Sequence, residues 1–340
     1  MGPVMMKSFP KLEHGRPALI LAPMEGVLDA ALRQMYSEFG GLCFAVSEFV
    51  RVSSAPLPAK VLLEIVPELR SSESGCETPG GLPVQVQLLG SEPSYVAETA
   101  LRAVQLGAGA IDLNFGCPSA TVNRHGGGAV MLRDPGRICA VAEAVRHAIG
   151  PDIALSAKIR LGWQDKKEGK DAASALENAG VDWIVVHART REQGYTGKPC
   201  WESLRQIVEE SRVPVVANGD ILDLESFRAC ELATGCAHFM IGRGALADPG
   251  LGRRLSGELR LNRADSAYSL PADFDPLQKG NWLPVFQRFS TICAARGARP
   301  EYTLRRLKQW LGWLASIHPG TREWVDPIRR TLSLAQALDS

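Results

Sequence analysis

Eight short apolar runs recur along the first 241 residues, and most of them are separated by stretches with the spacing of amphipathic helices. The predicted strands are 18–22, 43–47, 84–88, 110–114, 153–159, 182–187, 213–218 and 237–241, with helices at 92–106, 135–149, 170–179, 201–211 and 223–233. Nearly continuous apolar strands that alternate with helices are typical of a parallel sheet covered by helices. Eight such units in about 235 residues favour a closed (β/α)₈ TIM barrel over an open doubly wound sheet.

The strand pattern stops near residue 250, and this change sets the predicted domain organisation. Residues 1–17 are expected to be an N-terminal tail and 18–260 the barrel, with a loop excursion in the Ser-, Pro- and Gly-rich segment 53–82. Residues 261–280 have the composition of a linker. The apolar spacing in 281–340 predicts a small helical domain.

The composition of the chain indicates a globular protein of a reducing compartment. Of its 340 residues, 45% are hydrophobic and 22% charged, which argues against a disordered or coiled-coil protein. No apolar run approaches the ~20 residues of a membrane span, and the N-terminus lacks the features of a secretory signal. The eight cysteines suggest neither a zinc site nor a disulfide framework. We therefore predict a cytoplasmic protein without a metal site or membrane contact.

The net charge of +1 hides an uneven distribution along the chain. Residues 253–340 carry 14 Lys/Arg against 8 Asp/Glu, whereas residues 1–252 carry 24 against 29. A basic appendage on an acidic body is compatible with a polyanionic partner, but also with an unevenly charged surface that binds nothing.

Each apolar run ends in polar or glycine residues, and in a barrel of this type the active site lies at these C-terminal strand ends. A single polar strand end marks only the edge of a core, but eight of them at one rim predict an active site. In chain order the ends are Pro23-Met24-Glu25, Glu48, Gln87, Asn114, Lys158 with Arg160, His187, Asn218-Gly219-Asp220 and Gly242-Arg243-Gly244.

The last two strand ends predict a phosphate site, which barrels commonly place after strands seven and eight. Gly219 and Gly242 allow backbone N–H groups to approach an anion, and Arg243 supplies a charged donor. Lys158 suits the N1/O2 edge of a flavin, which gains negative charge on reduction, but also a Schiff-base mechanism. Gln87 can both donate to and accept from a pyrimidine-like edge.

The segment Asn114-Phe115-Gly116-Cys117-Pro118 directly follows the fourth predicted strand, so Cys117 is expected on a loop above the barrel mouth. The loop continues through the glycine-rich residues 123–128, which are flexible enough to act as a lid. A cysteine at this place can be a nucleophile, a proton donor or a packing residue. The spacing of the residues leaves these three roles open.

At these residues the chain resembles the tRNA-dihydrouridine synthase family, flavoenzymes with a (β/α)₈ fold. The resemblance covers essentially the whole chain, and EFVRV (48–52) and RRLKQWLGW (305–313) resemble the bacterial C-type subfamily, which modifies uridine 16 of the tRNA D-loop. The matching stretches are LAPMEGV (21–27), QLLG (87–90), DLNFGCPS (112–119), GGGAVML (126–132), KIRLGW (158–163), VVHARTREQGY (185–195), VVANGDI (215–221) and MIGRGAL (240–246).

The resemblance implies reduction of the C5–C6 bond of a tRNA uridine. NADPH would reduce a bound FMN and depart, hydride would pass from flavin N5 to uracil C6, and Cys117 would protonate C5. The implied flavin contacts are Pro23, Met24, Glu25, Gln87, Lys158, His187, Asn218, Gly219, Asp220, Gly242 and Arg243. Asn114 and Arg51 would hold the target base. On the helical domain we expect RNA contacts from Arg306, Lys308, Trp313 and Arg329.

Three other functions remain as alternatives. An FMN barrel oxidoreductase acting on a free pyrimidine has no use for a basic helical appendage. A Schiff-base lyase would be built on Lys158. An RNA-binding protein without catalysis does not need the set formed by Asn114, Cys117, Lys158 and His187. Within the resembled family, reduction at uridine 17 or 20 is the alternative to 16. We predict a monomer without an obligate protein partner.

Overall fold

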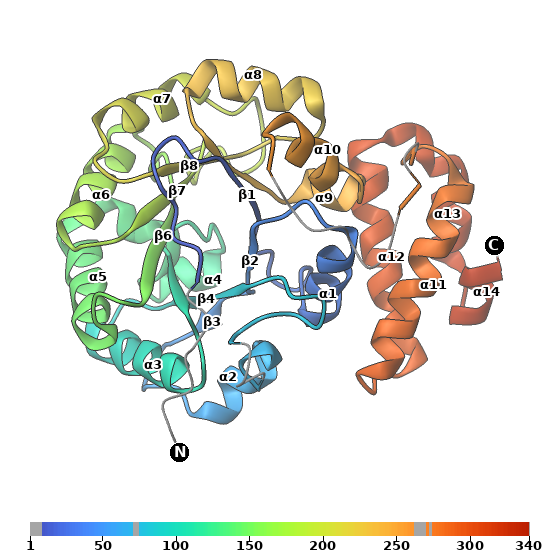
Figure 1. The fold of residues 1–340 in the computed structure, drawn as a ribbon, viewed down its shortest axis with the longest axis horizontal. Coiled ribbons are helices and arrows are strands. Elements are labelled where there is room, and N and C mark those ends of the chain that lie inside the picture. Colours follow the sequence, from blue (N-terminus) through green and yellow to red (C-terminus); the bar gives the residue numbers. More distant parts are fainter. Residues whose placement is uncertain (1–8, 71–74, 262–269, 272–273, 340) are drawn as a thin grey trace.

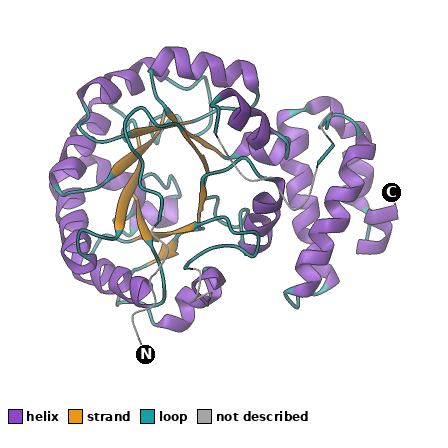
Figure 2. Cartoon of the chain, in the orientation of Figure 1, coloured by secondary structure: helices purple, strands orange, loops and turns teal. Residues whose placement is uncertain are grey.

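The computed structural model describes residues 9–70, 75–261, 270–271 and 274–339. Eight parallel strands close into a barrel, in the order β2-β1-β9-β8-β7-β6-β5-β4 with a further pairing between β2 and β4 (Figures 1 and 2). Their bounds are β1 Ala18–Leu21, β2 Phe44–Val46, β4 Val84–Leu89, β5 Ala110–Asn114, β6 Ala154–Arg160, β7 Trp183–His187, β8 Val215–Asn218 and β9 His238–Ile241. All eight lie at the predicted runs, and the predicted (β/α)₈ fold is confirmed. The short β3 (Val50–Arg51) extends the sheet beside β4.

Helices surround the barrel on its outside (Figure 2). The five predicted helices correspond to α3, α5, α6, α7 and α8. The expected excursion 53–82 contains α2 and a 3₁₀ turn, and its residues 71–74 lie outside the described ranges. The outer helices are α1 Ala30–Phe39, α2 Ala59–Ile65, α3 Pro93–Gln105, α5 Pro135–Ile149, α6 Lys167–Asn178, α7 Trp201–Glu210, α8 Leu224–Thr234, α9 Arg243–Ala247 and α10 Leu251–Glu258, and the loop after β5 adds α4 Ala120–Arg124.

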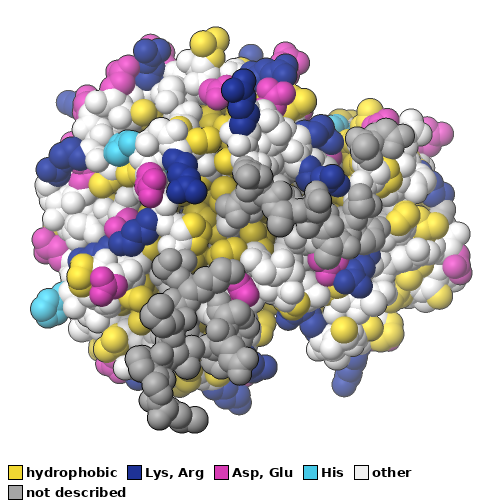
Figure 3. All heavy atoms as spheres, in the orientation of Figure 1, with side chains coloured by type: hydrophobic (Ala, Val, Ile, Leu, Met, Phe, Trp, Pro, Cys, Tyr) yellow, Lys and Arg dark blue, Asp and Glu magenta, His cyan; other side chains and the backbone are white. Residues whose placement is uncertain are grey.

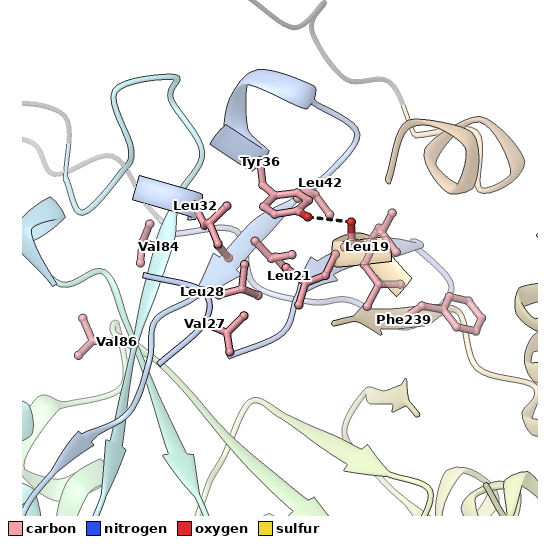
Figure 4. Packing of buried hydrophobic residues seen from close by; sticks show 14 of the residues in the cluster. Leu19, Leu21, Val27, Leu28, Leu32, Tyr36, Leu42, Val84, Val86 and Phe239 are labelled. Carbon is pink, nitrogen blue, oxygen red and sulfur yellow. Dashed lines mark hydrogen bonds between the residues drawn. The ribbon is translucent and has the colours of Figure 1, made fainter. Parts of the chain in front are cut away.

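The strands are buried on both faces, which explains their nearly continuous apolar sequences. In β1, Ala18 and Ile20 belong to the cluster inside the barrel, whereas Leu19 and Leu21 belong to the layer between strands and helices. This alternation follows from the period of two along a strand. Figure 4 shows Leu19 and Leu21 in the outer layer, near Tyr36 of α1.

The segment before β1 lies across the N-terminal end of the barrel (Figure 1). The ring of Phe9 packs against those of Phe44 and Trp183, with centroid distances of 4.9 and 6.5 Å. Lys11 Nζ donates to Asp182 at 3.0 Å. Part of the expected tail is therefore packed against the barrel, where Phe9 and Leu12 cover apolar side chains. This segment does not cover the opposite, C-terminal end of the barrel, where a functional site is expected.

The C-terminal helices stand beside α1 and α9 (Figure 1). They are α11 Lys279–Ala295, α12 Pro300–Ile317, α13 Arg322–Arg330 and α14 Leu334–Asp339. Their core is aromatic: the rings of Trp282, Phe286 and Phe289 pack around Trp310. Most of the expected linker 261–280 lies outside the described residues.

Two further properties bear on possible partners. Within the ranges described, no helix is both long enough and apolar enough to cross a membrane. On the face drawn in Figure 3, basic and acidic side chains are interspersed around the barrel.

Candidate active site

The C-terminal strand ends surround a cavity of about 340 Å³, a volume in the range of ligand sites. Every residue that was predicted to contact the cofactor lines this cavity, and so do Asn114, Cys117 and Trp313. The strand register explains this convergence: Asn114 is level with Lys158, and Arg160, His187 and Asn218 are level across β6, β7 and β8. The structure thus brings the predicted set together at one barrel rim.

A relay of buried side chains fixes the cavity on the side of β4 and β5. Ser156 donates to Asp112, whose other carboxylate oxygen accepts from Gln87 Nε2 at 2.7 Å. The Oε1 atom of Gln87 accepts from Asn114 Nδ2 at 2.8 Å. The Oδ1 atom of Asn114 then accepts from the backbone N–H of Cys117 at 2.9 Å. The relay therefore sets the orientation of both amides and holds the start of the cysteine loop.

The thiol of Cys117 lies against Leu89, Val122 and Phe49, and 9% of the residue is exposed. Burial raises the pKa of this thiol above its usual value, so the thiol keeps its proton at neutral pH. The loop returns closely over it: Gly128 has a φ of +69°, and a Cβ at Gly128 would lie 2.8 Å from the carbonyl oxygen of Cys117. Only glycine fits this approach. Because the thiol keeps its proton at neutral pH, it is available as a proton donor.

Three cationic side chains face the cavity. Burial, reinforced by the neighbouring charge of Arg160, lowers the pKa of Lys158 to about 8. Arg160 itself donates from Nε to the carbonyl of Gly116 at 2.8 Å. Burial, and then the charges of Arg160 and Lys158, keep the pKa of His187 well below its usual value, so this imidazole is neutral at pH 7. The three cations are therefore Lys158, Arg160 and Arg243, and their charge favours an anionic ligand.

The ends of β8 and β9 form the opposite side of the cavity. Asn218 Nδ2 donates to the carbonyl of Met240 at 2.9 Å. The Asp220 carboxylate accepts hydrogen bonds from Arg189 and from Arg243. The second of these bonds orients Arg243 at the cavity. Gly219 has a φ of +125°, and a Cβ there would lie 3.0 Å from the ring of His187. A side chain at this position would press on the histidine and narrow the cavity.

The sequence prediction did not include Asp112, Phe49 or Tyr195, which also belong to this site. Asp112 could have been found, because it lies two positions before Asn114 on the same strand and shares its direction. Phe49 lines the cavity from the loop after β2. Tyr195 lies between two cations, 5.5 Å from the guanidinium of Arg160 and 4.8 Å from that of Arg243. Both aromatic residues lie in stretches that carry the resemblance, EFVRV (48–52) and VVHARTREQGY (185–195), but no role was predicted for either of them.

The residues that were predicted to contact RNA differ in their exposure and contacts. Arg329 is exposed on α13, Arg51 is half-buried on β3, and half-buried Lys308 donates to the carbonyl of Thr331 at 2.6 Å. Trp313 lines the cavity, whereas its neighbour Trp310 is buried and donates to the carbonyl of Leu246.

The prediction for Arg306 requires a correction. Only 6% of this residue is exposed, because its guanidinium lies between α12 and the loop after β1. It pairs there with Asp29. A guanidinium that is enclosed and paired in this way presents no surface to RNA, so Arg306 belongs to the contact between barrel and C-terminal helices.

Known proteins resemble this chain in sequence and in fold. Residues 20–276 match the family model described as dihydrouridine synthase. The chain is 38% identical to the tRNA-dihydrouridine(16) synthase of Ralstonia nicotianae over 320 residues, 94% of either chain. It is also 38% identical to the enzymes of that name from Salmonella typhimurium, over 95% of this chain and 98% of that one, and from Escherichia coli, over 92% and 93%.

A solved structure, the histamine dehydrogenase from Rhizobium sp. 4-9, shares the barrel with a TM-score of 0.54 at 15% identity, covering 84% of this chain and 50% of that one. This likeness concerns the fold alone. The family model spans most of the barrel, and the relatives match over nearly their whole length. The chain belongs to the dihydrouridine synthase family.

Proposed function

We propose that this protein reduces the C5–C6 bond of uridine 16 in tRNA, with FMN as its bound cofactor and NADPH as the electron donor. The observation that carries the proposal is the position of Cys117. Its protonated thiol lies at the same cavity as Gln87, Lys158 and His187, and all four match the residues expected for this chemistry. The names of the relatives support tRNA as substrate and position 16 as the target.

The residues of the cavity fit FMN by the chemistry of their donors. Lys158 and Gln87 would hold the pyrimidine edge of the flavin, with the neutral His187 as a further hydrogen-bonding group. Arg243, with the backbone at Gly219 and Gly242, would hold the phosphate. The Asp220 carboxylate would keep Arg243 in place, as it does in the structure. Pro23, Met24 and Glu25 would complete the wall on the side of β1.

FMN, when bound, supplies hydride to uracil C6 with electrons taken from NADPH. The chain's own contribution is a proton, which passes from Cys117 Sγ to C5 and leaves a thiolate that must recover a proton from solvent. Asn114 and Arg51 would orient the base. A uracil within a stacked tRNA loop cannot reach this cavity, so the base must be flipped out of the stack.

The C-terminal helices would bind the tRNA backbone. Their exposed basic residues include Arg322, Arg329 and Arg330 of α13. Contacts of this kind fix the register of the RNA without reading its bases. We assign the barrel to residues 18–260, the linker to 261–280 and the tRNA-binding helical domain to 281–340. We further infer that the protein works as a monomer in the cytoplasm, without an obligate protein partner.

A direct assay tests the proposal. Purified protein would be examined for flavin absorbance and then incubated with NADPH and tRNA that lacks dihydrouridine. We expect a yellow protein that forms dihydrouridine in tRNA and leaves free uridine and uracil unreduced. Reduction of the free pyrimidine instead would favour the alternative oxidoreductase. A colourless protein that is trapped by borohydride in the presence of a carbonyl substrate would favour the Schiff-base alternative.

A further inference from the structure

Helix α12 carries three side chains that reach toward the cavity end of the barrel. Arg306, Trp310 and Trp313 share one face of the helix, because residues at i, i+4 and i+7 align on an α-helix. Arg306 contacts the loop after β1, Trp310 contacts α9, and Trp313 lines the cavity. The C-terminal domain thus touches two segments of the cavity wall and the cavity itself.

Arg306 holds the loop after β1 through all three nitrogens of its guanidinium. Nε donates to Asp29 Oδ2 at 3.1 Å, Nη1 donates to the carbonyl of Gly26, and Nη2 donates to the carbonyl of Val27. Asp29 is also the N-cap of α1 and accepts from Tyr302 of α12 at 2.7 Å. The planar guanidinium therefore fixes the loop in two ways, by its backbone and by its capping residue.

The loop that Arg306 holds is the one that lines the cavity with Met24 and Glu25. It turns back on itself, since the carbonyl of Met24 accepts from the N–H of Val27 at 3.0 Å. Glu48, which follows β2, accepts from the N–H of Gly26 at 2.6 Å. The loop is thus held between the end of β2 and α12, and loss of either contact would free its position.

Trp310 holds the neighbouring segment of the cavity wall, after β9, in a similar way. Its indole Nε1 donates to the carbonyl of Leu246 at 2.8 Å. Leu246 lies in α9, which begins at Arg243, the cationic residue of the cavity. The hydroxyl of Tyr36 donates to the adjacent carbonyl of Ala245 at 2.7 Å, as the dashed line in Figure 4 shows. Two buried side chains therefore set the position of α9.

We propose that Arg306 and Trp310 are positioning residues of the flavin site, and that α12 is a structural part of that site. This inference rests on the proposed function in one respect, namely that the cavity binds FMN. Arg306 sets the wall formed by Met24 and Glu25, and Trp310 sets the segment that carries Arg243. Flavin affinity then depends on a domain whose expected role was to bind RNA.

The test compares FMN binding by full-length variants in which these contacts are changed. Arg306→Met removes every hydrogen bond that this side chain makes to the loop. Arg306→Lys keeps the charge, but a single ammonium cannot hold two carbonyls and a carboxylate in one plane. Trp310→Phe keeps an aromatic ring among its neighbours but loses the N–H and part of the ring volume. We expect the FMN dissociation constant to rise about tenfold or more in Arg306→Met, with smaller increases in the other two.

Arg288→Met is the matched control. Arg288 crosses the same domain contact and donates twice to Glu38, at 2.7 Å each, near the end of α1. It holds neither the loop after β1 nor α9 in the hydrogen bonds described. We expect this variant to bind FMN as tightly as the wild type does. At saturating FMN, all four variants should bind tRNA with a dissociation constant within about twofold of the wild-type value, which corresponds to a small difference in binding free energy.

Several outcomes would overturn the inference. An unchanged FMN dissociation constant in both Arg306 variants would show that the loop does not need α12. An equal loss of FMN affinity in Arg288→Met would indicate that the contact between the barrel and the C-terminal helices is loosened in general. If the Arg306 variants lose tRNA affinity but bind FMN normally, Arg306 belongs to the RNA-binding surface. If Arg306→Met does not fold, the FMN dissociation constants of Arg306→Lys and Trp310→Phe decide the test. A wild-type protein that binds no FMN contradicts the proposed function as well, and this is recognised before any variant is compared.

Discussion

The relay from Ser156 through Asp112, Gln87 and Asn114 to the backbone of Cys117 combines three functions in one line of hydrogen bonds. It anchors the cavity, orients two amides and holds the loop that carries the thiol. Because Asp112 is an acceptor, Gln87 turns its N–H₂ group toward Asp112 and its oxygen toward Asn114. Burial raises the pKa of Asp112 to about 6, so at pH 7 the carboxyl is mainly the charged acceptor that this arrangement needs.

Replacing Asp112 by Asn should disturb this orientation. The new N–H₂ group can face Gln87 Nε2, and if Gln87 turns over in response, its bond to Asn114 is lost. A buried donor left without a partner costs about 1–3 kcal/mol. We expect FMN affinity and the rate of dihydrouridine formation each to fall about tenfold, measured by flavin titration and by tRNA digestion with mass spectrometry. Ser156→Ala, which leaves the Asp112–Gln87 bond in place, should have a smaller effect on both.

Cys117→Ala tests the proton donor. FMN binding and NADPH oxidation should remain nearly intact, since neither requires a proton at C5. Dihydrouridine formation should fall by about 10²-fold or more, as expected for loss of a positioned general acid. The raised pKa of the thiol also predicts a wild-type rate of this step that holds through neutral pH and falls only where the thiol ionises on the alkaline side. Modification at the normal rate by the alanine variant would rule out this role.

Among the helices of the C-terminal domain, α12 faces the barrel whereas α13 exposes basic side chains to solvent. The helix α12 is largely enclosed, and its Arg306, Trp310 and Trp313 face the barrel. The shorter α13 exposes Arg329 and Arg330 in its last turn. The excess of basic residues in the last part of the chain is therefore presented to solvent in part by α13.

The double variant Arg329→Ala, Arg330→Ala tests α13 as a phosphate-binding element. We expect weaker tRNA binding and a lower slope of log affinity against log salt, by about 0.7–0.9 per lost phosphate contact. FMN content should not change. Arg205→Ala on α7, an exposed residue on the outer wall of the barrel, is the control and should leave both quantities as in the wild type. Filter binding across a salt series gives the measurement, and an unchanged slope would remove α13 from the RNA surface.

The arrangement of the two domains bears on the choice of uridine. The cavity and Cys117 are fixed within the barrel, so the base that reaches them depends on how the whole tRNA lies across both domains. We expect phosphate contacts at the two ends of the proposed RNA-binding surface to set that orientation. Arg51 lies at the end of β3 beside the barrel mouth, and Arg329 lies on α13 in the C-terminal domain.

We expect reduction of uridine 16 alone, with uridines 17 and 20 unchanged. Arg51→Ala and Arg329→Ala should each raise the KM for tRNA while FMN binding and NADPH oxidation stay normal. Mass spectrometry of tRNA fragments after reaction in vitro identifies the modified position. Dihydrouridine at 20 and not at 16 would contradict the assigned position while leaving the family membership untouched.

Much of the barrel and of its rim could be predicted from the sequence because the signals are local. A strand buried on both faces needs a continuous apolar run, and the closure of eight strands places their C-terminal ends around one cavity. For this reason Gln87, Asn114, Lys158, His187 and Asn218 could be placed at one site before their contacts were known. The resemblance added the role of Cys117, which spacing alone left open.

The roles of the helical residues were decided by the tertiary structure. The apolar spacing around Trp310 and Trp313 predicts a helix but does not say which element covers each face, and here Trp310 enters the core while Trp313 reaches the cavity. Arg306, an expected RNA contact, instead binds Asp29, 277 positions earlier in the chain. A charged side chain has the same local pattern whether it faces solvent or a buried carboxylate. Only the packing of distant segments against each other determines which of the two it meets.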